Sequence, residues 1–143
     1  MVADYSQWDG GAGLSIQNSG YGIKNGWNIA TGSATPAGEP GTGSLKVAFE
    51  GMPEIDDEPN YTVLDTDYDT YSIVYSCGNF YGLFTFDLLW VLARENTFSA
   101  DANSVVAGII AEKLPSYDFE KNALHTRHGN FCPYEDRFAP ELY

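Results

Sequence analysis

The chain of 143 residues has little positive charge: it has 7 lysines and arginines against 20 aspartates and glutamates, a formal net charge of -13. A chain this acidic repels phosphate backbones and anionic membrane surfaces at neutral pH. Nucleic acid is therefore not an expected partner. Because this length suits one hydrophobic core, we expect a single domain over residues 1–143.

Long apolar runs are missing as well. The longest, around residues 88–93, has the length of a strand, whereas about 18 residues are needed to span a bilayer. The first residues, MVADYSQW, have neither the basic nor the apolar part of a secretory signal. No transmembrane segment and no signal peptide are predicted in this chain, which is then either cytosolic or a mature or truncated form.

Cysteine is scarce, with Cys77 and Cys132 only, enough for one disulfide or two thiols. A reactive cysteine needs a base or a helix N-terminus beside it, and neither Cys77 nor Cys132 has such a neighbour in the sequence. His125 and His128 stand close to Cys132, but a zinc site wants three or four convergent ligands. Residues three apart on a strand also point to opposite faces, so no metal site is predicted.

Glycine, in contrast, is plentiful, with 15 residues. In the first fifty residues it separates short β-type segments, and turns recur every eight to twelve residues, as in sandwiches and barrels. Asn25-Gly26 predicts a tight hairpin with positive φ at both central positions. Leu45, Val47 and Phe49 alternate with less apolar neighbours, which predicts a strand with one dry face.

Aromatic residues are abundant too: 10 tyrosines, 8 phenylalanines and 3 tryptophans. Tyrosine and tryptophan combine a large apolar body with a polar group. Three of the aromatic residues share one face of the predicted strand 82–94, which carries Phe84, Phe86, Leu88, Trp90 and Leu92. This composition favours a cavity lined with rings, although the same side chains could also fill a barrel completely.

Two further strands, residues 61–67 and 70–77, are predicted around an acidic turn near Tyr68-Asp69. One helix follows, from the N-cap Ser99 over about residues 100–114, and Pro115 ends it. Its apolar stripe comprises Val105, Val106, Ile109, Ile110 and Leu114. The tail 115–143 reads as coil, with a short strand around residues 123–128. About seven strands over residues 2–94 followed by one helix predict an all-β, up-and-down antiparallel barrel with the helix packed outside.

The acidic turn also has the start of a calcium loop. Asp65, Asp67 and Asp69 stand at positions 1, 3 and 5 of an EF-hand pattern, but Thr70 replaces the required glycine and Ser76 the bidentate glutamate. A solvated hairpin turn is the better interpretation. Residues 60–62, Asn-Tyr-Thr, form a glycosylation acceptor if the protein passes through a secretory route.

Two longer motifs resemble a known family. TDYDTYSIVYSC, residues 66–77, and FTFDLLWVLAREN, residues 84–96, are similar to the second and third conserved regions of lipocalins, in the form seen in apolipoprotein D and in the crustacyanins, the carotenoid-binding colour proteins of crustaceans. ADYSQW resembles the second strand of the family and NFCPYE the crustacyanin tail. The resemblance covers residues 2 to about 136 and implies a lipocalin-type barrel from which the first strand is missing.

The resemblance implies a carrier, not an enzyme, that holds one elongated apolar molecule in its calyx, with no catalytic cofactor. A carotenoid such as astaxanthin is the first expectation, a bilin the nearest alternative, and a steroid or fatty acid follows. Matching positions imply that Tyr5, Asn18 and Trp90 line the pocket. Phe49 joins them by alternation and Phe86 by sharing a face with Trp90. Tyr61 and Tyr75 complete the predicted set, although alternation does not decide which way they point.

The family also implies secretion and disulfides. In it, Cys77 and Cys132 would each pair with a cysteine that lies before Met1 here, so we expect a truncated or divergent form. Arg94 matches an arginine that packs across a tryptophan of the first strand. The open edge of such a barrel invites pairing with another chain, as a homo- or hetero-oligomer. Two alternatives of another class are a lipocalin-type thiol enzyme that uses Cys77 on a bound lipid, and a structural subunit of a pigment oligomer.

Overall fold

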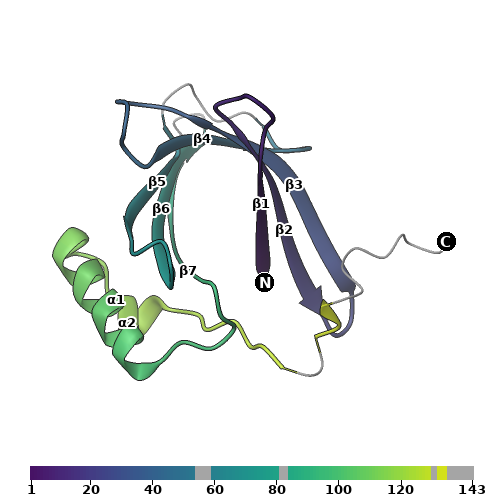
Figure 1. The fold of residues 1–143 in the computed structure, drawn as a ribbon. Helices are drawn as coiled ribbons and strands as arrows, with labels where there is room; N and C mark the ends of the chain where they lie inside the picture. Colours follow the sequence, from purple (N-terminus) through teal and green to yellow (C-terminus); the bar gives the residue numbers. More distant parts are fainter. Residues whose placement is uncertain (54–58, 81–83, 130–131, 135–143) are drawn as a thin grey trace.

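A computed structural model describes residues 1–53, 59–80, 84–129 and 132–134, and shows a curved sheet with a helix beside it (Figure 1). The strands form one seven-stranded sheet in which each strand pairs antiparallel with its neighbour in sequence, so the predicted all-β, up-and-down order with a C-terminal helix is confirmed. β1 and β7 are the two edges of the sheet. The elements are β1 Val2–Gln7, β2 Leu14–Gly22, β3 Gly26–Pro36, β4 Ser44–Phe49, β5 Tyr61–Thr66, β6 Tyr71–Phe80, β7 Phe84–Ala93, α1 Ala100–Lys113 and α2 Phe119–Asn122.

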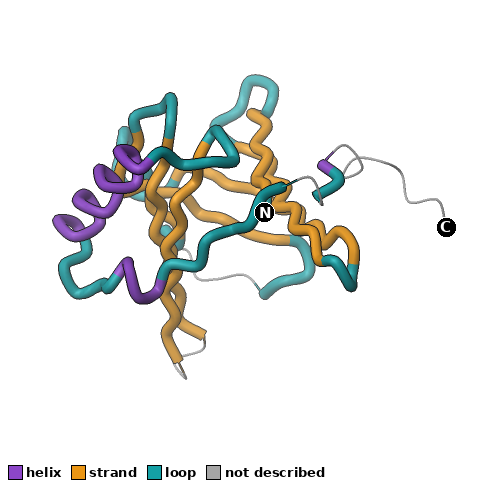
Figure 2. Tube along the Cα trace, turned by 90° about the horizontal axis from the view of Figure 1, so that it is seen from below, coloured by secondary structure: helices purple, strands orange, loops and turns teal. Residues whose placement is uncertain are grey.

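The two faces of the sheet differ in what covers them. The hydroxyls of Tyr5 on β1 and Tyr61 on β5 lie 3.4 Å apart although several strands separate them in the sheet. Side chains of such distant strands can meet only on the inside of a strongly curled sheet, so we call this side the concave face. Helix α1 lies on the other side, the convex face, against the later strands (Figures 1 and 2).

The most deeply buried cluster lies between α1 and the convex face. Ile73 on β6 and Val106 and Ile110 on α1 are at most 1% exposed. The helix is capped as predicted, since the Ser99 side chain accepts a hydrogen bond from the backbone N–H of Ala102. The predicted stripe is wrong at one position: Val105 is 53% exposed, because it lies beside the helix surface that faces the sheet.

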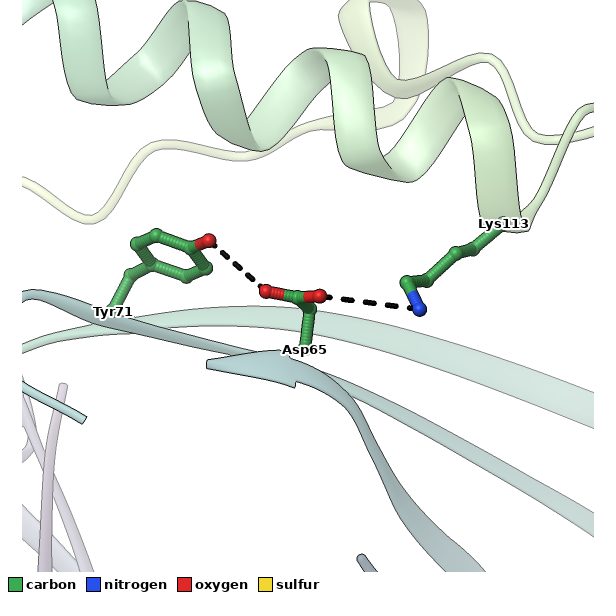
Figure 3. Close-up of polar contacts among 3 residues, drawn as sticks. All are labelled: Asp65, Tyr71 and Lys113. Carbon is green, nitrogen blue, oxygen red and sulfur yellow. Dashed lines mark hydrogen bonds and ion pairs between the residues drawn. The ribbon is translucent and has the colours of Figure 1, made fainter. Parts of the chain in front are cut away.

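A bulge in β5 adds a polar contact to this layer. The register with β6 shifts between Val63 and Asp65, and Asp65 then stands opposite Ile73, on the convex face. Its carboxylate accepts a hydrogen bond of 3.0 Å from the Tyr71 hydroxyl and lies 3.9 Å from the Lys113 ammonium (Figure 3). The bulge therefore turns an acidic side chain toward the end of α1.

The acidic turn is closed by a carboxylate. Oδ1 of Asp67 accepts backbone N–H bonds from Asp69, Thr70 and Tyr71 at 3.1, 2.7 and 3.0 Å. These bonds hold the turn in which Tyr68 has a positive φ of 65°. Asp65 and Asp67 thus bind different partners within the protein, as in a hairpin, whereas a calcium loop needs its carboxylates to converge on one ion.

The other predicted hairpin forms with different geometry. β2 and β3 end at the paired residues Gly22 and Gly26, so the loop comprises residues 23–25. Only Gly26 has a positive φ, 69°, whereas we predicted one at Asn25 as well. A three-residue loop needs one left-handed residue after its turn, and the glycine supplies it.

The predicted strand over residues 123–128 is wrong. Asp118 caps the short helix α2 by accepting the N–H of Lys121, and residues 123–128 after it form no strand. The segment instead runs from α2 past the N-terminus to the β2–β3 hairpin (Figures 1 and 2). Neither helix in the described part of the chain has the length and hydropathy to cross a bilayer.

Candidate functional site

The register of the ladders assigns side chains to the concave face, because residues directly opposite one another share a face. Tyr5 stands opposite Ile16, Ile16 opposite Gly32 and Gly32 opposite Phe49. Farther along the sheet, Tyr61 stands opposite Leu45. Trp90 stands opposite Val74, and alternation along β7 places Phe86, Leu88 and Leu92 on the same side; the side chain of Phe84 lies outside the described part. Apolar and aromatic side chains from β1 through β7 therefore share this face.

Three aromatic residues meet at its centre. The rings of Tyr61 and Trp90 stack with a centroid distance of 6.4 Å and an interplanar angle of 24°. The Tyr61 hydroxyl also lies 3.4 Å from that of Tyr5. Burial first, and then the hydrogen bond with Tyr5, raises the pKa of Tyr61 far above its ordinary value. Its hydroxyl consequently stays protonated and keeps a proton to donate.

Glycines set the orientation of two further rings. A Cβ on Gly32 would come within 2.9 Å of Cδ1 of Phe49, and one on Gly78 within 2.5 Å of the Phe86 ring. Both rings therefore lie over the backbone of the neighbouring strand, in space that only glycine leaves open. This packing holds Phe49 and Phe86 flat along the concave face.

The concave face is only partly covered by the chain itself. Ile16 and Val74 are 5% and 1% exposed and form its floor. Above them Tyr5 and Leu88 are 44% and 45% exposed, and Phe49, Tyr61, Phe86 and Trp90 are half-buried. A face on which apolar and aromatic side chains remain partly open to solvent is typical of a site that takes up an apolar partner.

Six of the seven predicted site residues lie on this face. They are Tyr5, Asn18, Phe49, Tyr61, Phe86 and Trp90; Asn18 is half-buried and stands two residues after Ile16 on β2. Tyr75 is separated from them, since it stands opposite Leu89, which packs against the helix cluster. Burial, and after it the charge of Asp87, raises the pKa of Tyr75. Contact of any of these residues with a ligand remains a prediction.

Cys77 also lies on the convex face. It stands opposite Asp87, two residues after Tyr75, and it is exposed. Cys77 and Cys132 are both free thiols in the described structure. A thiol that attacks a lipid bound on the concave face would have to point toward that face. Cys77 points away from it, which argues against the thiol-enzyme alternative.

Asn60, which the sequence offers as a glycosylation acceptor only if the protein passes through a secretory route, has a structural role in the fold. Its side chain accepts the N–H of Val47 at 2.8 Å and donates to the Val47 carbonyl at 2.9 Å, and the residue is only 6% exposed. The nitrogen to which a sugar would be attached is therefore engaged inside the fold. Glycosylation at Asn60 does not fit the folded protein, and no local pattern in the sequence could have shown this.

Comparisons with known proteins agree with this architecture. The model of the "Lipocalin / cytosolic fatty-acid binding protein family" matches residues 10–113. Apolipoprotein D of Mus musculus is 33% identical over 133 residues, 93% of this chain and 66% of the relative. Apolipoprotein D of Cavia porcellus is 38% identical over 73 residues, 51% of this chain and 36% of the relative. The chain thus spans about a third to two thirds of the length of these relatives.

Solved structures show the same fold. Lobster apocrustacyanin A1 superposes with a TM-score of 0.72 at 22% identity, covering 93% of this chain and 68% of that one. H1 crustacyanin from the lobster Homarus americanus gives the same values. At this level of identity the likeness extends to the fold alone.

Proposed function

The chain belongs to the lipocalin / cytosolic fatty-acid binding protein family, and from that premise we propose that it binds one small hydrophobic molecule on the concave face of its sheet. The observation that carries the proposal is the open aromatic surface around Tyr61 and Trp90. Its rings are held in place by stacking and by glycine contacts and are half-buried, and Tyr5 and Leu88 beside them are 44% and 45% exposed. A ligand that covers them gains about 25 cal/mol for each Å² of apolar surface removed from water.

The polar groups of the face suit a ligand with oxygen at one end. The Tyr5 and Tyr61 hydroxyls form the polar contact at its centre, next to the stacked Trp90 ring. Paired hydroxyls can donate to a keto oxygen while the rings contact a flat conjugated body. Together with the crustacyanin-like motifs, this favours a carotenoid such as astaxanthin. A bilin is the nearest alternative, and a steroid or fatty acid would use the same surface with fewer ring contacts.

The remaining expectations belong to the same proposal. The protein acts as a single-domain carrier and not as an enzyme, and it works outside the cell, as the resemblance to lipocalins implies. β1 and β7 lie at the two edges of the sheet, and an edge offers free backbone groups to another strand. Assembly with a second chain, of the same or another kind, would use these edges.

The test is a binding experiment with coloured and colourless ligands. The purified protein is mixed with astaxanthin, biliverdin or radiolabelled oleate and passed over a gel-filtration column, and the absorbance and the radioactivity of the protein peak are recorded. We expect astaxanthin to coelute and its visible band to shift. Trp90→Leu should weaken binding at least tenfold, because it removes the largest ring of the face. Coelution of biliverdin in its place would select the alternative pigment.

Tyr75→Leu is the matched control, since it removes a ring from the opposite face of the same sheet. It should leave the affinity within about twofold. If none of the three ligands coelutes, or if Tyr75→Leu weakens binding as much as Trp90→Leu, the concave face is not the binding site.

A further inference from the structure

A cavity lies away from the concave face. Its volume is about 480 Å³, and its walls come from the β2–β3 hairpin, the start of β1 and the segment that follows α2. Val2 and Trp27 line it. Val2 is three residues from Tyr5 on β1, and Trp27 is five residues from Gly32 on β3, so alternation turns both away from the concave side. The cavity is thus separate from the site proposed above, and it does not depend on that proposal.

The wall formed by the hairpin is aromatic and apolar. The rings of Tyr21 and Trp27 stand edge to face with a centroid distance of 5.3 Å. Ile23 at the tip is 84% exposed and Tyr21 is 37% exposed. Binding of an apolar ligand would remove part of these exposed apolar side chains from water, which stabilises the complex.

The charge of the cavity is opposite to that of the protein. Lys24, from the hairpin, and Arg127, from the segment after α2, both line it, and no aspartate or glutamate is among the described residues that do so. Neither cation forms an ion pair with another described residue. In a chain with 7 basic and 20 acidic residues, two cations from distant segments, with no acidic side chain among the described residues of the wall, create a local positive potential.

We propose that this cavity binds a small organic anion with an apolar body, such as a fatty carboxylate. The carboxylate lies between Lys24 and Arg127, where charge-assisted hydrogen bonds are available. The hydrocarbon chain lies along Tyr21, Trp27 and Ile23. The volume is within the roughly 300–1,000 Å³ usual for small-molecule sites.

The test is titration calorimetry with sodium decanoate, and with decan-1-ol as the uncharged counterpart. We expect decanoate to bind the unaltered protein at least tenfold more tightly than decanol, and more weakly as sodium chloride is added, because salt screens exposed charges. The double variant Lys24→Gln, Arg127→Gln should lose at least tenfold in affinity. Ile23→Glu should do the same, since it places a like charge at the mouth. All three substituted side chains are exposed, so the fold tolerates the changes.

Val105→Glu is the matched control: it also replaces an exposed β-branched side chain by glutamate, on α1. Its decanoate affinity should stay within twofold of the unaltered protein. Three results would each overturn the proposal: no binding of decanoate, equal affinity for decanol, or equal affinity of all variants for decanoate, which would locate the anion elsewhere.

Discussion

The side-chain amide of Asn60 takes the place of a strand residue opposite Val47. The ladder between β4 and β5 has only two residue pairs, Ser44 with Thr62 and Leu45 with Tyr61. The backbone N–H of Asn60 donates to Leu45, and its side chain then satisfies both backbone groups of Val47. One amide thus extends a short ladder by another pair and holds β4 where Phe49 can reach the concave face.

Asn60→Ala should lower the free energy of unfolding by about 2–4 kcal/mol, because both hydrogen bonds are lost and the partly buried groups of Val47 remain unpaired. Urea denaturation measures this. Asn103→Ala, at an exposed position of α1, is the control and should change stability by less than about 0.5 kcal/mol. Equal effects of the two substitutions would contradict the role given to Asn60.

Asp67 predicts a dependence of stability on pH. Backbone N–H groups of Tyr71 and Thr70 lower the pKa of Asp67 from 3.8 to about 2. Because the folded pKa is the lower one, the stabilisation is complete above about pH 4 and is lost as the pH falls toward 2. Asp67→Asn should therefore be less stable than the unaltered protein at neutral pH, and the difference should shrink between pH 4 and pH 2. Chemical denaturation at a series of pH values measures it.

Asp69→Asn serves as the control in that series, since it removes the same charge from the same turn at an exposed side chain. Its difference from the unaltered protein should vary less over this pH range. A parallel course for both variants would show that net charge, and not the turn, is responsible.

Two adjacent valines on α1 provide a matched test of the helix cluster. Val106 is fully buried, whereas Val105 is 53% exposed. Val106→Ala should cost about 2 kcal/mol, from two methyl groups removed from the core and the cavity left behind. Val105→Ala should be neutral within about 0.5 kcal/mol, because alanine favours helix and little area is lost. Thermal or urea unfolding of both variants measures this. Similar losses of unfolding free energy would show that α1 does not face the sheet in this orientation.

Tyr61→Phe removes the hydroxyl and keeps the ring, so it tests the contribution of the hydroxyl alone. With astaxanthin, whose end rings carry oxygen, we expect about three- to tenfold weaker binding, the usual worth of one hydrogen bond. With β-carotene, which has no oxygen, the affinity should not change. Fluorescence quenching measures both, and Tyr75→Phe on the convex face should affect neither. A loss with β-carotene as well would show that the substitution disturbs the ring stack and not the polar contact.

The sequence predicts the elements well where one signal dominates. Ser99 marks the start of α1, and the alternation around Val47 assigns a face that the register supports. The side-chain directions on β6 are harder to predict, because both of its faces are covered. Ile73 packs against α1 and is 0% exposed, and Val74 lies on the concave face and is 1% exposed. A strand buried on both faces shows no clean alternation, so the direction of Tyr75 could not be read from the sequence.

Long-range partners explain most of what sequence reasoning missed. The bulge near Val63 depends on how β5 meets β6, and the role of Asn60 depends on a residue thirteen positions away. The cavity beside the β2–β3 hairpin needs Arg127, which the sequence places more than one hundred positions from Lys24. Such pairs carry no local pattern and become visible only when the chain is folded.

The position of β6 also has a consequence for how the molecule opens. From Ser72 to Tyr75 its backbone is bonded to β5 on one side and to β7 on the other, while Ile73 and Val74 are buried on its two faces. Amide protons there can meet deuterium only when the entire fold comes apart, whereas those at the outer edge of β1 exchange through small local fluctuations. The slowest protons should therefore report the global stability, and a molecule bound on the concave face should slow them further, because it binds only the folded state.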